Sequence, residues 1–149
     1  MKHLHDPARV AEVKSRLAQL RTDSQRQWGK MTAPQAVAHM SVAFEAALGD
    51  VAIKRLFIGR LIGGFVKKSA LGNDAPIMKN APTAPEYLVV DQRDLDRERD
   101  RLRTLIDRFA VGPSVCTTQP HAFFGPLTPD EWAILMYKHV DHHLRQFGV

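Results

Sequence analysis

Three helix-start signals divide the sequence, and each precedes a segment whose apolar residues recur at helical spacing. Residues 32–35 (TAPQ) and 128–131 (TPDE) match the capping box, in which a Thr hydroxyl and a Gln or Glu side chain satisfy free backbone N–H groups. Asp6 followed by Pro7 is an N-cap with a proline at the first helical position. Because no period typical of β-strands rises above noise, the sequence predicts an all-α fold.

These signals predict four principal helices in a single domain that spans residues 1–149. The first runs from residue 7 to about residue 20, the second from residue 33 to a stop at Gly49, and the last from residue 129 almost to Gly148. A charge-rich helix lies within residues 86–110, where five apolar residues form a stripe: Leu95, Leu102, Leu105, Ile106 and Phe109. Four such helices in one domain indicate a four-helix bundle.

Residues 51–71 are apolar but are interrupted by Gly63 and Gly64. We expect an extra helical segment here, between the second and third bundle helices, kinked or split at the glycines. Its basic residues, among them Lys54 and Lys68, are compatible with a helix that lies on a membrane surface. The favoured interpretation is a core helix with a solvated edge. Residues 73–85 and 111–127 are predicted loops.

The composition limits the classes of function. The single Cys116 excludes an internal disulfide and a Cys-rich zinc site and is typical of a reducing cytosol, so we expect a cytoplasmic location. No run of about 18 apolar residues predicts a membrane span. The formal net charge is +5, yet Lys and Arg are mixed with Asp and Glu along the chain, which argues against nucleic-acid binding.

The last helix carries His139 and His143, four residues apart and therefore on one helix face. At roughly 100° per residue, both fall within the predicted buried stripe, near Met136 and Gln146. Burying two imidazoles costs free energy unless their nitrogens find partners, which a shared metal ion or hydrogen bonds to backbone or carboxylate groups would supply. His142 lies at the edge of the stripe, where a surface or supporting role is favoured over ligation.

His39 is the best candidate for a third ligand, because the neighbouring positions on its helix face carry small residues that let another helix approach. Three His ligands leave an open coordination position, as in catalytic metal sites. Glu45 lies on another side of this helix and no carboxylate is clearly aimed at the site, which weakens a hydrolase mechanism that needs a general base.

Residues 119–147 and residues 28–40 (WGKMTAPQAVAHM) resemble the two signatures of the DUF1569 branch of the DinB/YfiT-like superfamily. The resemblance extends over most of the chain and implies a four-helix bundle with up-down-down-up connections. It also implies a divalent metal, most often zinc or nickel, held by one His on the second bundle helix and an HxxxH pair on the fourth. In this sequence those positions are His39, His139 and His143, the residues that helix geometry selects.

Better-known members of the superfamily are thiol-dependent transferases and isomerases, and others are taken to be hydrolases. We therefore expect a metal-dependent enzyme that activates a low-molecular-weight thiol or a water molecule for a small-molecule substrate. The alternative is a non-catalytic, stress-associated metal-binding module. Gln146 could hydrogen-bond a ligand imidazole or a metal-bound water. His121 could line the pocket mouth, although a surface or capping role is favoured for it. Trp28 and Trp132 are predicted core aromatics. The resemblance and the apolar segment 53–65 also suggest a homodimer.

Overall fold

The predicted capping signals start three of the helices. In the computed structural model, which describes residues 1–81 and 83–149, five α-helices and two short 3₁₀ helices account for the regular structure. The α-helices are α1 (Pro7–Ala18), α2 (Ala33–Leu48), α3 (Phe57–Leu71), α4 (Leu95–Phe109) and α5 (Pro129–Gln146), and the 3₁₀ helices are η1 (Pro85–Tyr87) and η2 (Pro113–Val115). No strand occurs in the described residues, so the all-α prediction is confirmed.

Both capping boxes form as the sequence predicts. The Thr32 hydroxyl accepts a hydrogen bond from the backbone N–H of Gln35, whose side-chain oxygen accepts one from the backbone N–H of Thr32. Thr128 and Glu131 repeat this exchange at the start of α5. At the other end of α2, Gly49 has a left-handed backbone (φ 82°), a conformation that glycine adopts without a steric penalty.

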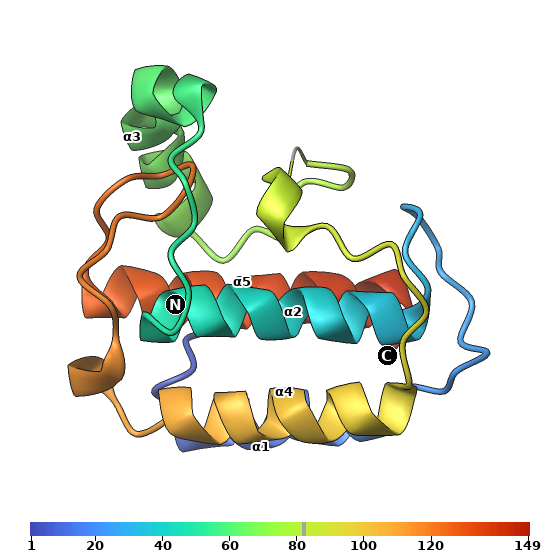
Figure 1. Cartoon of the computed structure of the whole chain (residues 1–149). Coiled ribbons are helices and arrows are strands. Elements are labelled where there is room, and N and C mark those ends of the chain that lie inside the picture. The colour runs from blue at the N-terminus through green and yellow to red at the C-terminus, as the bar shows by residue number, and fades with distance from the viewer. Residues whose placement is uncertain (82) are drawn as a thin grey trace.

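Four helices pack in a ring in which α2 contacts α4 and α5, and α1 contacts the same two helices (Figure 1). Ion pairs define the helix directions. Arg16 of α1 pairs with Asp141 of α5, and the side chain of Glu12 accepts from the Tyr137 hydroxyl one turn earlier on both helices, so α1 and α5 run the same way. α2 and α4 run together in the opposite direction, since Glu45 pairs with Arg101 and, further along both segments, Asp50 pairs with Arg108.

The core lies between these four helices. All four helices contribute to its largest fully buried side chains, which include Leu17, Phe44, Leu102, Phe109 and Trp132. The stripe predicted for the charge-rich helix is buried throughout: Leu95, Leu102, Leu105, Ile106 and Phe109. Within residues 1–81 and 83–149, no helix has the length and apolar character needed to cross a membrane.

The extra segment between the second and third bundle helices differs from the prediction. It is one continuous helix, α3, that begins only at Phe57 and passes through Gly63 and Gly64 without a break. Of the two predicted forms, kinked or split at the glycines, the split helix was therefore wrong, and so was a start near residue 51. α3 lies outside the four-helix ring, at the top left of Figure 1.

The prediction that this segment is a core helix was also wrong, because its apolar face points outward. Phe57 is 76% exposed, Leu61 66% and Phe65 87%. The inward face carries Gly59 and Gly63, which lie against the backbone of Phe123 so closely that a Cβ atom at either glycine would overlap the Phe123 carbonyl oxygen. Only a glycine face allows this backbone contact, and it turns the bulky residues of α3 away from the core.

Lys138 of α5 fastens the end of α3. Its ammonium group donates hydrogen bonds to the backbone carbonyls of Ala70 and Asn73, and the side chain is buried. A cation is favourable at this end of a helix, where the last carbonyl groups lack intrahelical partners. Burial lowers the pKa of Lys138 from its usual value.

The contact between α3 and Phe123 predicts opposite effects for two neighbouring glycines. We expect Gly63→Ala to destabilise the protein by about 1–3 kcal/mol, because the new methyl group meets a backbone carbonyl that cannot move aside. Gly64→Ala meets no atom within 4 Å and should stabilise by about 0.5–1 kcal/mol through helix propensity. Urea denaturation and limited proteolysis of α3 measure both variants. Equal effects at the two positions would contradict this packing.

Candidate metal centre

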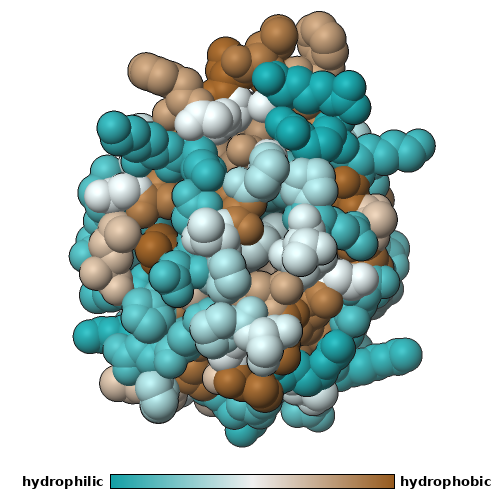
Figure 2. Space-filling model, turned by 90° about the vertical axis from the view of Figure 1, so that its left-hand side faces the viewer, coloured by the Kyte–Doolittle hydropathy of each residue, from teal (hydrophilic) through white to brown (hydrophobic). Residues whose placement is uncertain are grey.

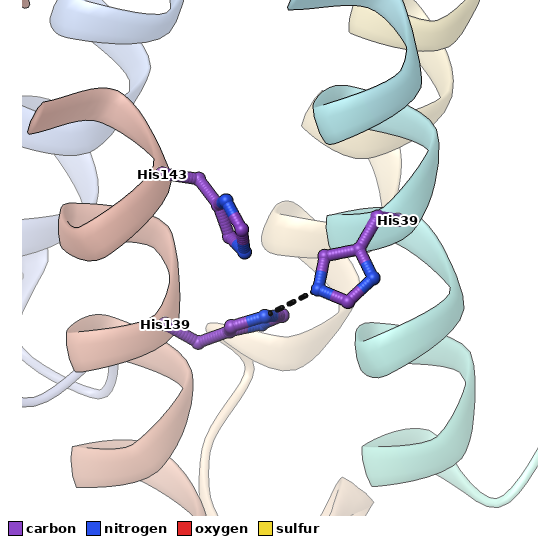
Figure 3. Close-up of side chains that lie close together, drawn as sticks. All are labelled: His39, His139 and His143. Atoms are coloured by element: carbon purple, nitrogen blue, oxygen red, sulfur yellow. Dashed lines mark hydrogen bonds between the residues drawn. The ribbon is translucent and has the colours of Figure 1, made fainter. Parts of the chain in front are cut away.

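The structure brings three predicted histidines together between α2 and α5. His39 projects from α2, and His139 and His143 project from successive turns of α5 (Figure 3). The ring centroids form a nearly equilateral triangle with sides of 4.8–4.9 Å. One nitrogen from each ring lies within 4.8 Å of the other two, so the three side chains could hold a metal ion.

The local sequence explains why the rings meet. His39 and His143 are 5% and 6% exposed, and His139 is half-buried. Ala36 and Ala43, which flank His39 at helical spacing, are both buried and leave room beside the imidazole for α5 to approach. α2 packs against α5, and the two histidines of α5, one turn apart, face the single histidine of α2 (Figure 3).

The backbone of Tyr87 determines which nitrogen of His39 carries hydrogen. His39 Nδ1 lies 2.8 Å from the Tyr87 carbonyl oxygen, which can only accept a hydrogen bond. Nδ1 therefore holds the proton of the neutral ring, and Nε2 presents a lone pair toward the other histidines. Tyr87 belongs to η1 and reaches the site through its main chain.

Gln146 plays the same part for His143. The Gln146 amide nitrogen donates to the Trp28 carbonyl, which leaves its oxygen as the acceptor, 2.8 Å from His143 Nδ1. His143 Nδ1 consequently carries hydrogen, and its Nε2 is also a bare lone pair. Of the two predicted partners of Gln146, an imidazole of the cluster or a metal-bound water, the structure shows the contact with the His143 imidazole.

Hydrogen bonding among the described residues satisfies this cluster only in part. His139 Nε2 lies 2.9 Å from His39 Nε2. Since His39 Nε2 carries no hydrogen, a hydrogen bond between these two atoms requires His139 Nε2–H to be the donor. The buried Nδ1 of His139 then has no hydrogen-bond partner in the part of the chain that the structure describes. Two nitrogens with fixed lone pairs, on His39 and His143, therefore lie beside a third imidazole, an arrangement that could hold a positive ion.

The donor set fits a divalent metal ion. In a tetrahedral zinc site with Zn–N bonds of about 2.0–2.1 Å, the ligand nitrogens are roughly 3.3 Å apart. In this structure, His39 Nε2 and His139 Nε2 are 2.9 Å apart, and no two of the three candidate ligand nitrogens are more than 4.8 Å apart. The spacing expected for zinc falls between these two values. Neutral imidazoles with the second nitrogen hydrogen-bonded to a carbonyl oxygen are the usual arrangement of metal-binding histidines.

Burial keeps the imidazoles in the neutral form that a metal ion requires. Desolvation lowers the pKa of His143 to about 3 and lowers the pKa of His39. The pKa of His139 is lowered well below its usual value, first by burial and then by the neighbouring His143. Protons are therefore poor partners for these lone pairs at neutral pH.

A pocket of about 600 Å³ opens beside the three histidines. Its walls are mainly apolar and come from α3, from residues 73–81 after it, from the loop before α2 and from the loop before α5, with Val66, Ile77, Met31 and Phe124 as examples. Among the described residues that line it, none is Asp or Glu. The site thus joins a cluster of nitrogen ligands to a pocket large enough for a small molecule, without a carboxylate.

Two further histidines line the same pocket. His121 is not a free surface group, because its Nδ1 accepts hydrogen bonds from the backbone N–H groups of Phe123 and Phe124 and its ring stacks on Phe124. Burial lowers the pKa of His121 to about 4, so its neutral ring carries hydrogen on Nε2. His142 is half-buried beside His143 and meets the Trp28 ring edge to face.

The two tryptophans have different environments. Trp132 is 2% exposed and belongs to the core, as predicted. Trp28 is half-buried in the loop before α2, lines the pocket and has the ammonium group of Lys79 4.3 Å from its ring centroid, so the prediction of a core role was wrong. Sequence reasoning also missed Tyr87, because a main-chain carbonyl leaves no signal in residue type.

Comparison with known proteins gives one result. No curated protein and no solved structure matches the chain significantly. Residues 3–148, almost the whole sequence, match the family described as "Protein of unknown function (DUF1569)". The match includes the helices that carry the three histidines and the loop segments that line the pocket. The chain therefore belongs to the DUF1569 family.

Proposed function

We propose that this protein is a metal-dependent enzyme in which His39, His139 and His143 hold a divalent ion, zinc or nickel, beside the pocket. The observation that carries the proposal is the pair of fixed lone pairs on His39 and His143, which face a third imidazole in a buried site. With three protein ligands, such an ion has at least one position open to an exogenous ligand. It would supply Lewis acidity that holds a thiol or a water molecule in its deprotonated form at neutral pH.

Thiol transfer is favoured over hydrolysis. A hydrolase of this type uses a general base, most often a carboxylate, and no described residue lining the pocket is Asp or Glu. A thiolate is a strong nucleophile that needs no base in the attack step. The apolar walls would bind the substrate's carbon skeleton and exclude water. The Nε2–H of His121 is available to donate a hydrogen bond to a polar group of the substrate.

The arrangement of helices supports assignment to the DinB-like superfamily. α1 and α5 run one way and α2 and α4 the other, which gives the up-down-down-up order, and α3 is inserted between the second and third helices of the ring. The three histidines occupy the second and fourth helices of that ring. The low-molecular-weight thiol, the cytoplasmic location and the homodimer stay predictions.

Metal content should depend on His143 and not on its neighbour. We expect the wild-type protein to bind about one zinc or nickel ion per chain, and His143→Ala to lower the affinity about a hundredfold or more by removing one ligand. His142→Ala, the matched control one residue away, should retain the ion. Elemental analysis and competition with a chromophoric chelator measure both.

The melting temperature of the same variants separates an open, functional site from a structural one. If His143→Ala loses the ion and has a melting temperature close to that of the wild type, the ion has a functional role and is not needed for folding. A large loss of stability would instead favour the non-catalytic module. A wild-type protein that is purified without chelator, is reloaded and still binds neither metal would contradict the proposal.

Gln146 should tune the affinity without touching the ion. Gln146→Leu removes the acceptor of the His143 Nδ1–H group, and we expect the metal affinity to fall about 10–100-fold, as for other residues that orient metal-binding histidines. Gln146→Glu keeps an acceptor at this position and should restore most of the affinity. If both variants bind metal equally weakly, the contact does not orient His143.

Activity should require both the metal ion and a thiol. We expect the metal-loaded protein to accelerate conjugation of at least one biological thiol, such as bacillithiol, mycothiol or glutathione, to a model electrophile. His143→Ala should lose this acceleration and His142→Ala should keep more of it. Ester or amide hydrolysis without thiol, at a higher rate than any conjugation, would favour the water-activating alternative.

A further inference from the structure

The outward face of α3 is an apolar patch with no partner in this chain. Five large side chains within roughly the first two and a half turns form it: Phe57, Ile58, Leu61, Ile62 and Phe65. At 100° per residue they cover one continuous side of the helix, an arc of roughly 140°. Figure 2 shows apolar side chains gathered at the top of the molecule, where α3 lies. A patch of this kind on a folded chain marks an interaction site.

The charged residues that α3 itself and residues 51–56 before it carry are all positive; Lys67, toward the inner side of α3, pairs with Glu131 of α5. Residues 51–73 contain no Asp or Glu. Lys54, Arg60 and Lys68 are exposed, and within the described residues no acidic group forms an ion pair with them. The flanking acids are engaged elsewhere. Asp50 pairs with Arg108, and the Asp74 side chain accepts a hydrogen bond from the backbone N–H of Lys2.

The inner face of α3 packs against the rest of the molecule. Gly59 and Gly63 rest on the Phe123 backbone, and Lys138 holds the end of the helix. The helix therefore cannot rotate to bury its apolar side without losing these contacts. An amphipathic helix is thus held rigidly with Phe and Leu outward and cations at its borders, the composition of helices that lie in a lipid interface.

We propose that α3 docks this protein onto an anionic lipid surface. Phe57, Leu61 and Phe65 would enter the boundary between headgroups and acyl chains, while Lys54, Arg60 and Lys68 contact lipid phosphates. The proposal rests on the surface of α3 and does not depend on the metal centre.

A second copy of the chain fits this face less well. In a two-fold dimer the same patch meets itself, so the cations that border one α3 would face those of the other. No acidic residue in the segment 51–73 compensates them. Like charges brought together at an apolar contact disfavour association, whereas an anionic surface neutralises them.

Vesicle flotation with the full-length protein tests the proposal. The probes are vesicles of pure phosphatidylcholine and vesicles that also contain phosphatidylglycerol. We expect binding to the anionic vesicles that weakens as salt rises, and little binding to the neutral ones. Arg60→Glu/Lys68→Glu should lower the bound fraction roughly tenfold or more, whereas the control Arg103→Glu/Arg97→Glu on exposed positions of α4 should change it little.

The apolar contribution has its own control. Leu61→Ser/Phe65→Ser replaces exposed side chains, so the fold should survive and vesicle binding should fall; Val90→Ser/Val111→Ser, at exposed sites outside α3, should bind as the wild type does. Absence of binding to anionic vesicles at low salt would overturn the proposal. The proposal would also be overturned if the wild type did not bind vesicles but formed a dimer, measured by light scattering, that Leu61→Ser/Phe65→Ser dissociates.

Discussion

The close approach of α2 and α5 at His39 is the contact on which the site depends. Small side chains on α2 let the helices meet, and the meeting buries three imidazoles whose nitrogens have few other partners. Tyr87 and Gln146 then fix the tautomers of two rings through single hydrogen bonds. Burying these nitrogens without partners costs free energy. A bound cation would offset that cost, because the lone pairs of His39 and His143 already point toward a common position.

Glycine and lysine determine the position of α3 more than its apolar residues do. Gly59 and Gly63 allow the helix backbone to rest on Phe123, and Lys138 binds its last carbonyls. The inner side of the same helix contributes Val66 and Ala70 to the pocket wall. α3 therefore links two features of the molecule, since one face closes the candidate metal pocket and the opposite face is the exposed apolar patch.

Helix phase predicted much of the site from the sequence. Placing His139 and His143 on the buried stripe of one helix and His39 among alanines on another selects the residues that the structure brings together. The roles of Tyr87 and Trp28 could not be predicted this way. Tyr87 contributes a main-chain carbonyl, and Trp28 reaches the pocket from a loop whose path depends on the packing of other elements.

The sequence by itself determined where α2 and α5 start, because the capping boxes at Thr32 and Thr128 act through residues three positions apart. It also determined which face of α4 and α5 is buried, since helical periodicity is a local property. Only the tertiary structure decided which side of α3 faces the core. Apolar content predicted burial for Phe57 and Phe65, but the backbone contact between Gly63 and Phe123, sixty residues away, turned them to the surface.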